Sequence, residues 1–170
     1  MPIVQYSDWF NATQPATTIT SPAITLKWGV NNRHYKRAAA ALTVTTFDAT
    51  SVCRLLTLKR SDVIAAIDIT NDGVSTGTAC DVGLHAAGTA HDGAVVDADE
   101  FATALAINAA AVSANGFVNS PLRKGTPVWE IAGYSTMASA PEEFDLTLTC
   151  TTAVATGNEG IVVEVFGSFS

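Results

Sequence analysis

Hydrophobic and polar residues alternate along several short stretches of this chain. The clearest stretch is FDLTLTCTT at residues 144–152, where Phe144, Leu146, Leu148 and Cys150 alternate with polar residues. A period of two predicts a β-strand with one buried and one solvated face. Similar patterns, or short apolar runs, predict further strands at residues 24–30, 42–46, 52–60, 63–70, 79–84, 128–132 and 160–166.

The same alternation assigns faces within the predicted strands. It places Cys80 in the interior, and it places Asp81 and Asp145 on solvated faces. In residues 63–70 the positions placed on one face are Val63, Ala65, Ile67 and Ile69.

Turn-forming residues separate the strands. Gly-, Pro-, Asn-, Asp- and Ser-rich segments lie at residues 70–77, 86–93, 119–127, 139–143 and 155–160. About eight strands at this spacing, without long amphipathic helices between them, predict an all-β fold. We therefore expect an antiparallel β-sandwich or jelly roll.

One stretch, DADEFATALAINAAAVSANG, has an ambiguous pattern. Phe101, Leu105 and Val112 fit a helical stripe, whereas other apolar residues in the same stretch fit strand alternation. We expect a short helix capped by Asp97 or Asp99 that runs into another strand, because Asp is a favoured N-cap residue.

The first 22 residues have the composition of an extended arm. They combine three prolines and several threonines with Tyr6, Trp9 and Phe10, which indicates an arm with aromatic anchors. We divide the chain into residues 1–40, an extended N-terminal arm with the first strand that docks on a partner, and residues 41–170, the β-sandwich body.

Charge is distributed unevenly between the two ends of the chain. Residues 1–60 hold seven Lys or Arg and two acids, a net of +5, whereas residues 61–170 hold two and fourteen, a net of −12. Only 15% of the residues are charged, which is low for a soluble monomer and indicates that much of the surface contacts other protein. The acidic body disfavours nucleic acid as a partner.

The cysteines and the apolar segments indicate in which compartment the protein resides and whether it binds a cofactor or a membrane. Cys53, Cys80 and Cys150 are far apart, lack zinc-binding spacing and fall on apolar faces, so we expect free thiols in a reducing compartment. The N-terminus lacks the pattern of a signal peptide, and no apolar run is long enough to span a bilayer. We expect no cofactor and no membrane contact.

Residues 80–105 contain the densest group of reactive side chains. Cys80, His85, His91 and Asp92 could bind a transition metal, and Asp97, Asp99 and Glu100 could supply part of a calcium shell. The spacing matches neither a zinc pattern nor an EF-hand. We therefore interpret the stretch as a strand, a glycine-containing loop and a helix cap, without a resident metal.

Catalytic motifs give little support for an enzyme. The chain has no GxSxG, GxGxxG or Walker sequence. Carboxylates for glycoside hydrolysis would have to come from Glu130, Glu142, Glu143 or Asp145, none of which has a distinctive context. The cluster NNRHYKR at residues 31–37 could stack nucleic-acid bases, but it suits an acidic protein surface better because the body is acidic.

The order of several segments resembles small structural proteins encoded in the head modules of tailed phages. The similar segments are RLLTLKR, VIAAIDITND, CDVGLHAAG, HDGAVVDADEFATALAI and the closing PVWEIAG to GIVVEVF, within residues 50–167. The family pattern has a DVGLY-like strand, a Gly-rich loop and a VVDAD segment. This chain departs from it in having His85 where an aromatic residue is common, and in its longer N-terminal arm.

The resemblance implies a non-enzymatic virion protein with a β-sandwich or jelly-roll body. Such proteins decorate the outside of the capsid, bind the major capsid protein and often form trimers, after assembly in the host cytoplasm. We expect the binding residues in the basic and aromatic N-terminal part of the chain: Tyr6, Trp9, Phe10, Trp28, Arg33, Lys36 and Arg37.

Two other functions remain open at this point. The same fold could serve in a neck, tail or fibre-associated virion protein, and position in a particle would distinguish these from a decoration protein. A carbohydrate-binding module for host attachment would need exposed aromatic residues. Outside the arm, only Trp129 and Tyr134 are candidates.

Overall fold

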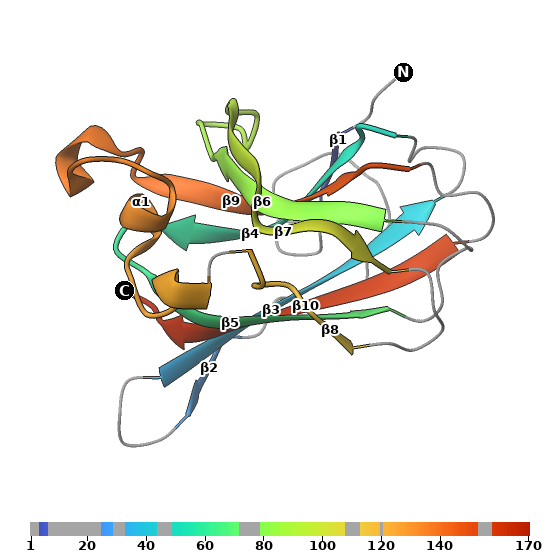
Figure 1. Cartoon of the computed structure of the whole chain (residues 1–170), viewed down its shortest axis with the longest axis horizontal. Coiled ribbons are helices and arrows are strands. Elements are labelled where there is room, and N and C mark those ends of the chain that lie inside the picture. Colours follow the sequence, from blue (N-terminus) through green and yellow to red (C-terminus); the bar gives the residue numbers. More distant parts are fainter. Residues whose placement is uncertain are drawn as a thin grey trace.

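The computed structural model describes residues 4–6, 25–28, 33–43, 49–71, 79–107, 113–119, 121–152 and 158–170. The described strands form two five-stranded sheets that pack against one another (Figure 1). Sheet A has the order β1 (Val4–Tyr6), β4 (Val52–Lys59), β9 (Glu143–Cys150), β6 (Ala79–Ala86) and β7 (Val95–Ala106). Sheet B has the order β2 (Thr25–Trp28), β3 (Arg33–Thr43), β10 (Asn158–Ser168), β5 (Val63–Asn71) and β8 (Ser113–Asn115).

The eight strands from β3 to β10 have the connectivity of a jelly roll. They form two four-stranded halves, with the orders β4-β9-β6-β7 and β3-β10-β5-β8, and their neighbours run antiparallel. The chain passes from one sheet to the other at every step except β6 to β7, which form a hairpin. Two such interleaved sheets define the double-sheet jelly roll. The predicted all-β sandwich or jelly roll is confirmed.

The hydrophobic core lies between the two sheets. Its largest fully buried side chains include Phe144, Leu58 and Leu84 from sheet A and Ile64 and Ile67 from sheet B. The core continues to one side of the sandwich through Phe101 and Phe117, whose rings meet edge to face with centroids 4.9 Å apart. Aromatic pairs in this geometry contribute about 0.5–1.5 kcal/mol beyond the area that they bury.

The N-terminal strands extend one side of both sheets. β1 runs parallel to β4 at the edge of sheet A, and β2 runs antiparallel to β3 at the edge of sheet B. Because an uncovered edge exposes unpaired backbone groups, these strands protect the β3 and β4 edges from unwanted pairing. β3 pairs with β10 from His34 to Thr43, so the expected boundary at residue 40 falls inside a strand of the sheet.

Two bulges change the faces that alternation predicted. The β5–β10 pairing shifts by one residue between Phe166 and Gly167, so Ala65 is exposed and Ile64 is buried instead. The prediction that Ala65 shares the buried face of Ile67 was therefore wrong. A similar shift in β4 leaves both Leu55 and Leu56 fully buried. An inserted residue exchanges the faces of all residues beyond it.

The predicted helix after Asp97 is also wrong, because residues 95–106 form strand β7. Asp97 Oδ1 accepts a hydrogen bond from the Asp99 backbone, and Asp99 Oδ2 accepts one from Thr103. The β6–β7 register shifts three times, and Ala104 has a φ of 48°. These irregularities bury the adjacent Phe101 and Ala102 together, which hides the strand period in the sequence.

The predicted strand at residues 128–132 forms the short helix α1 (Val128–Ile131) instead. Val128 and Ile131 are buried, and their spacing of three suits a helix rather than a strand. The helix lies in a connection that also holds the 3₁₀ turns Pro121–Arg123 and Met137–Ser139. Backbone hydrogen bonds from residues 125, 128 and 129 tie this connection to the β4–β5 turn and the start of β5, and it closes one end of the sandwich (Figure 1).

Gly83 in β6 provides a test of the close approach of β7. A Cβ atom at this position would overlap the backbone of Asp97 and Ala98. We expect Gly83→Ala to lower the free energy of unfolding by about 3 kcal/mol, because a backbone cannot give way as a side chain does. Urea denaturation would measure the loss.

Gly125→Ala is the matched control for this test. Gly125 has a φ of 88° and open space around its Cα, so this substitution should cost only about 1 kcal/mol of backbone strain. A Gly83→Ala protein as stable as the wild type would contradict the close crossing of the two strands.

Candidate functional site

The polar stretch at residues 80–105 forms β6, a loop at residues 87–94 and β7. The loop is fastened to the sheet by backbone hydrogen bonds from Ala86 to Ala94, from Gly93 to Ala87 and from Ala87 to Glu143. His91 and Gly88 have φ values of 54° and 65°, which give the loop its tight turns. The side chains on the outer face of sheet A beneath the loop are therefore shielded from water.

A buried ion pair lies on this outer face. Arg54 of β4 and Asp145 of β9 meet at 2.5 Å between Nη1 and Oδ2, and their side chains are 4% and 0% exposed. Arg54 also donates to the backbone carbonyls of Ala86, at 3.3 Å, and Gly93, at 2.7 Å. One guanidinium group thus holds the β9 carboxylate and both ends of the loop. Its buried Nε has no hydrogen-bond partner among the described residues.

Two further side chains complete the surroundings of Asp145. His91, at the turn of the loop, places Nδ1 3.0 Å from Asp145 Oδ1. Thr57 of β4 donates to the same oxygen at 3.3 Å. The prediction that Asp145 lies on a solvated face is therefore wrong, because the loop folds over that face and Arg54 neutralises the carboxylate.

His85 lies beside this pair and is also buried. Its Nδ1 is 3.0 Å from Thr147 Oγ1, and only 8% of the residue is exposed. Burial and, to a smaller extent, the positive charge of Arg54 lower the pKa of His85 to about 4. His85 is therefore neutral at pH 7.

This cluster has the features of a structural fastening rather than a reaction centre. Its charged groups are already engaged with one another and with the loop backbone. Among the described residues, no group of three or more His, Cys, Asp or Glu side chains is arranged to hold a metal ion. Within the same part of the chain, no helix is long and apolar enough to cross a membrane.

The three cysteines are buried free thiols, as the sequence predicted. Burial raises the pKa of Cys53. An interaction with the Cys150 side chain that favours the neutral thiol, together with burial, raises the pKa of Cys80. Such thiols are unreactive toward solvent while the sheet is closed.

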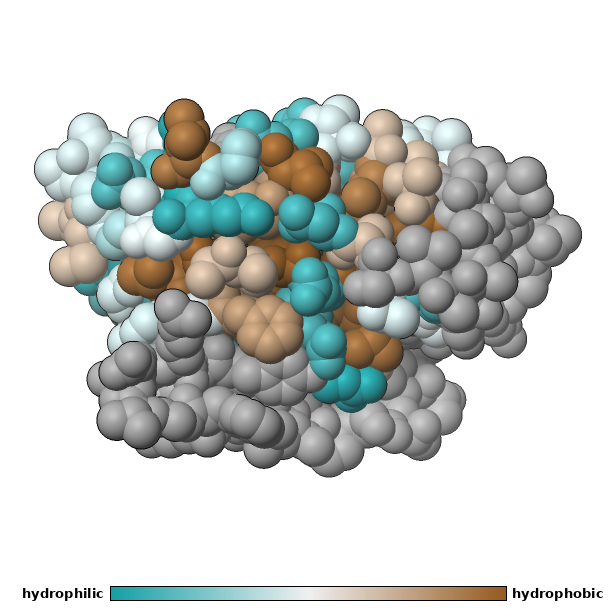
Figure 2. Space-filling model, turned by 60° about the horizontal axis from the view of Figure 1, so that its bottom comes forward, coloured by the Kyte–Doolittle hydropathy of each residue, from teal (hydrophilic) through white to brown (hydrophobic). Residues whose placement is uncertain are grey.

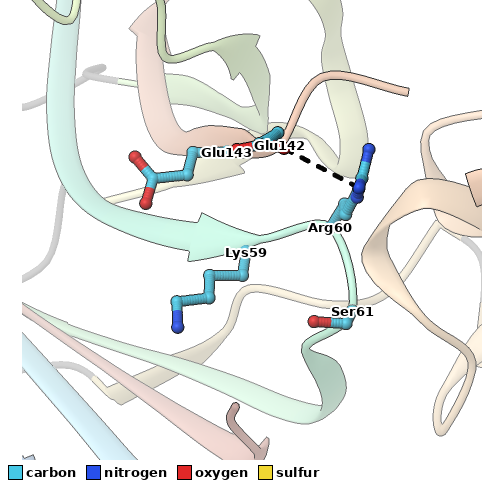
Figure 3. A pocket seen from close by; sticks show the side chains of 5 residues that line it. All are labelled: Lys59, Arg60, Ser61, Glu142 and Glu143. Carbon is cyan, nitrogen blue, oxygen red and sulfur yellow. Dashed lines mark ion pairs between the residues drawn. The ribbon is translucent and has the colours of Figure 1, made fainter. Parts of the chain in front are cut away.

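A cleft of about 260 Å³ lies at the β4–β5 turn and is lined by Lys59, Arg60, Ser61, Glu142 and Glu143. Figure 3 shows Arg60 and Glu142 pointing toward one another, with 3.8 Å between their charged atoms, whereas Lys59 and Glu143 diverge. Glu142 is 87% exposed at its side chain, so neither carboxylate has the environment of a catalytic acid.

The seven residues expected to bind a partner are distributed over the N-terminal part of the chain. Tyr6 lies in β1, Trp28 in β2, and Arg33 at the start of β3, next to Trp28 in the β2–β3 pairing. Trp9 and Phe10 lie outside the described residues. Arg37 is partly exposed and lies opposite Glu164 in the β3–β10 pairing.

Lys36, another of the seven residues, has its ammonium group engaged inside the body. It is 9% exposed and pairs with the buried Asp62 at 3.1 Å, and it lies 4.6 Å from the centre of the Phe169 ring. Asp62 also accepts hydrogen bonds from the backbone and side chain of Ser170. Lys36 thus fastens the last residues to the β4–β5 turn, and we leave it out of the docking surface proposed below.

Exposed apolar side chains provide a surface feature that alternation did not identify. In the described residues, the large hydrophobic side chains that are most exposed are Val95, Val118, Leu122, Met137 and Phe166. Leu122 is 96% exposed, in the 3₁₀ turn beside Arg123 and Lys124, which are the two cations of residues 61–170. Figure 2 shows hydrophobic groups reaching one face at several places between polar side chains, without one continuous patch among the coloured residues.

Comparison with known proteins finds similarity in structure alone. No family model matches the chain, and no curated protein matches it. Two solved structures do. A chain of the capsid of Ralstonia phage GP4 matches with a TM-score of 0.57 and 14% identity, covering 98% of both chains.

The second match is a chain of the cyanophage Pam1 capsid asymmetric unit. Its TM-score is 0.51 and its identity is 12%, and the match covers 92% of this chain and 100% of that one. The fold of this protein is therefore one that occurs, at nearly the same length, in two phage capsid assemblies.

The buried ion pair can be tested by removing one partner. We expect Asp145→Ala to lower the free energy of unfolding by about 3–5 kcal/mol, because Arg54 would remain buried without a counter-charge. Replacing both groups with apolar residues, as in Arg54→Met with Asp145→Leu, should cost clearly less. Urea denaturation of the three proteins would measure the difference.

Glu143→Ala is the control for that experiment. Glu143 lies two residues away on the same strand but is exposed, so its loss should change stability by less than about 0.5 kcal/mol. If Asp145→Ala were as mild, the pair would not hold the loop on the sheet.

The lowered pKa of His85 predicts how the free energy of unfolding depends on pH. Its folded pKa of about 4 lies below the unfolded value of 6.5, so the unfolded chain binds the proton more readily. The free energy of unfolding is therefore not reduced by protonation of His85 above pH 6.5. It decreases as the pH falls from 6.5 toward 4, by at most about 1.4 kcal/mol per pH unit.

The matched variant for this prediction is His85→Gln, which can still hydrogen-bond Thr147 but does not titrate. The difference in unfolding free energy between wild type and variant should change across pH 4 to 6.5 and be constant above it. A difference independent of pH would show that His85 keeps its ordinary pKa in the folded protein.

Proposed function

We propose that this chain is a non-enzymatic structural protein of a tailed-phage virion, one that binds the outer capsid surface and stabilises the head. The observation that carries the proposal is the full-length likeness in fold to chains of two phage capsid structures. The resemblance of residues 50–167 to phage head proteins supports it independently, because that resemblance was drawn from sequence segments rather than from the fold.

The chemistry of the described residues supports the same proposal. The buried charges at Arg54, Asp145, Lys36 and Asp62 are used to fasten loops and the last residues to the sheets. The cleft described above is lined by polar and charged side chains that are exposed or, for Arg60, partly exposed, and none of these lining residues is a buried acid or base. This is the arrangement of a rigid building block rather than of an enzyme.

We place the contact with the major capsid protein on the N-terminal segment. β1 and β2 lie at the edges of the two sheets on the same side of the sandwich, where β3 and β4 lie. The first 60 residues carry a net charge of +5, opposite to the body, which suits an acidic partner surface. Within this segment Tyr6, Trp9, Phe10 and Trp28 are the proposed apolar anchors, and Arg33 and Arg37 the proposed charged contacts.

The protein would act as a homo-oligomer, with a trimer favoured, because decoration proteins of this kind bridge neighbouring capsomers. A neck, tail or fibre-associated position is the alternative within the same class. A glycan-binding role has less support, since Trp129 and Tyr134 are both partly buried against the core. The Tyr134 ring packs on the Phe144 ring, with 6.1 Å between the ring centroids.

Deleting residues 1–22 tests the docking segment. We expect a folded body that no longer co-sediments with capsids assembled without this protein, whereas the full chain binds them. Because the deletion also removes β1, thermal unfolding must show that the body is still folded. Unchanged binding by the truncated protein would contradict the proposal.

A double variant distinguishes the loss of the aromatic anchors from the loss of strand β1. Trp9→Ala with Phe10→Ala keeps residues 4–6 and should weaken capsid binding tenfold or more, because aromatic anchors usually dominate such interfaces. Counting copies per particle by mass measurement completes the test. Hundreds of copies are expected for decoration, and a dozen or fewer would point to the neck or tail.

A further inference from the structure

Two of the three buried thiols lie directly opposite each other on neighbouring strands. Cys80 is the second residue of β6, Cys150 is the last residue of β9, and the two are partners in the antiparallel β6–β9 register. Both side chains belong to the core and are at most 1% exposed. They therefore point to the same side of sheet A.

The backbone hydrogen bonds show which kind of pair this is. Cys150 donates its N–H to Ser51 and accepts from Thr50 through its carbonyl, so both of its backbone groups point toward β4 and away from β6. The next pair along, Ala79 with Thr151, is joined by a backbone hydrogen bond. Cys80 and Cys150 are thus a non-hydrogen-bonded pair, in which opposite Cα atoms lie about 4.5 Å apart.

This separation lies within the range that a disulfide bridges, about 4.4–6.8 Å between Cα atoms. The two side chains also interact, and this interaction contributes to the raised pKa of Cys80. Cys53 belongs to the same core, but its partner in β9 is Leu148, so it lies diagonally from Cys150. Diagonal positions are about 7–8 Å apart, which is too far for a disulfide without backbone movement.

We propose that Cys80 and Cys150 form an oxidation site, at which a small disulfide oxidant such as oxidised glutathione produces a cross-strand bond between β6 and β9. In the reaction one thiolate attacks the oxidant, releasing one glutathione thiol and leaving a mixed disulfide. The second thiolate then displaces the other glutathione thiol. The protein loses two protons and two electrons, and one oxidised glutathione becomes two reduced molecules.

Access to the pair comes from the ends of the strands. Thr151 and Thr152, which follow Cys150, are exposed, and Ala79, before Cys80, is only half-buried. Local opening of the terminal pair Ala79 and Thr151 would expose the thiols without opening the rest of the sheet. The folded protein should therefore stay reduced in a reducing cytoplasm and oxidise slowly in an oxidising medium.

The experiment uses the full chain, refolded from urea with oxidised glutathione so that access does not limit the reaction. Free thiols are then alkylated, and trypsin places the three cysteines in different peptides, residues 38–54, 61–123 and 125–170. We expect one dominant linked product, which joins 61–123 to 125–170. The oxidised protein should be 2 Da lighter than the reduced one and melt several degrees higher, an effect reversed by dithiothreitol.

Three variants make the assignment specific. Cys53→Ala, the matched control from the same core, should form the link and show the rise in melting temperature as the wild type does. Cys80→Ala and Cys150→Ala should form no internal link and show no rise. A linked product containing Cys53 in equal or greater amount, or no link between Cys80 and Cys150 in the refolded wild type, would overturn the proposal.

Discussion

The pairing of Arg54 with Asp145 determines how the outer face of sheet A is organised. Neither charge reaches water, so each depends on the other and on the loop that covers them. Arg54 also donates through Nη1 and Nη2 to the carbonyls of Ala86 and Gly93, which fixes both ends of the loop between β6 and β7. A buried pair of this kind adds little net stability, but it penalises any arrangement that separates the charges, so it specifies where the loop must lie.

The jelly roll imposes a second constraint, because every connection between β3 and β10, except the one from β6 to β7, crosses to the opposite sheet. Loops must therefore cross the ends of the sandwich, and the described connections are fastened there by specific groups. The connection that contains α1 is tied to the β4–β5 turn through backbone bonds to Asp62 and Arg60. Asp62 also holds Lys36 and the end of the chain. The charged groups of this protein thus act on its architecture, which accords with a structural role in a particle.

The N-terminal segment connects this architecture to the proposed function. Its strands β1 and β2 extend one edge of each sheet, so the segment is part of the fold as well as the proposed contact with the capsid. A protein that reinforces a shell needs a rigid body and a separate means of attachment. In this chain the N-terminal segment is basic and the body is acidic, so the two parts differ in the surfaces that they can bind. The paired thiols at the start of β6 and the end of β9 would strengthen sheet A further once oxidised.

The sequence by itself determined the fold class, the positions of most strands and the burial of the cysteines, because these depend on a period of two and on local turn residues. It could not determine β7 or α1. In β7, bulges against β6 bury the neighbours Phe101 and Ala102. In α1, four residues are too few to distinguish the period of a helix from that of a strand. It also placed Asp145 in solvent and Lys36 on a docking surface. Only the tertiary structure shows that a loop covers the first and that Asp62 neutralises the second, because both depend on residues distant in sequence.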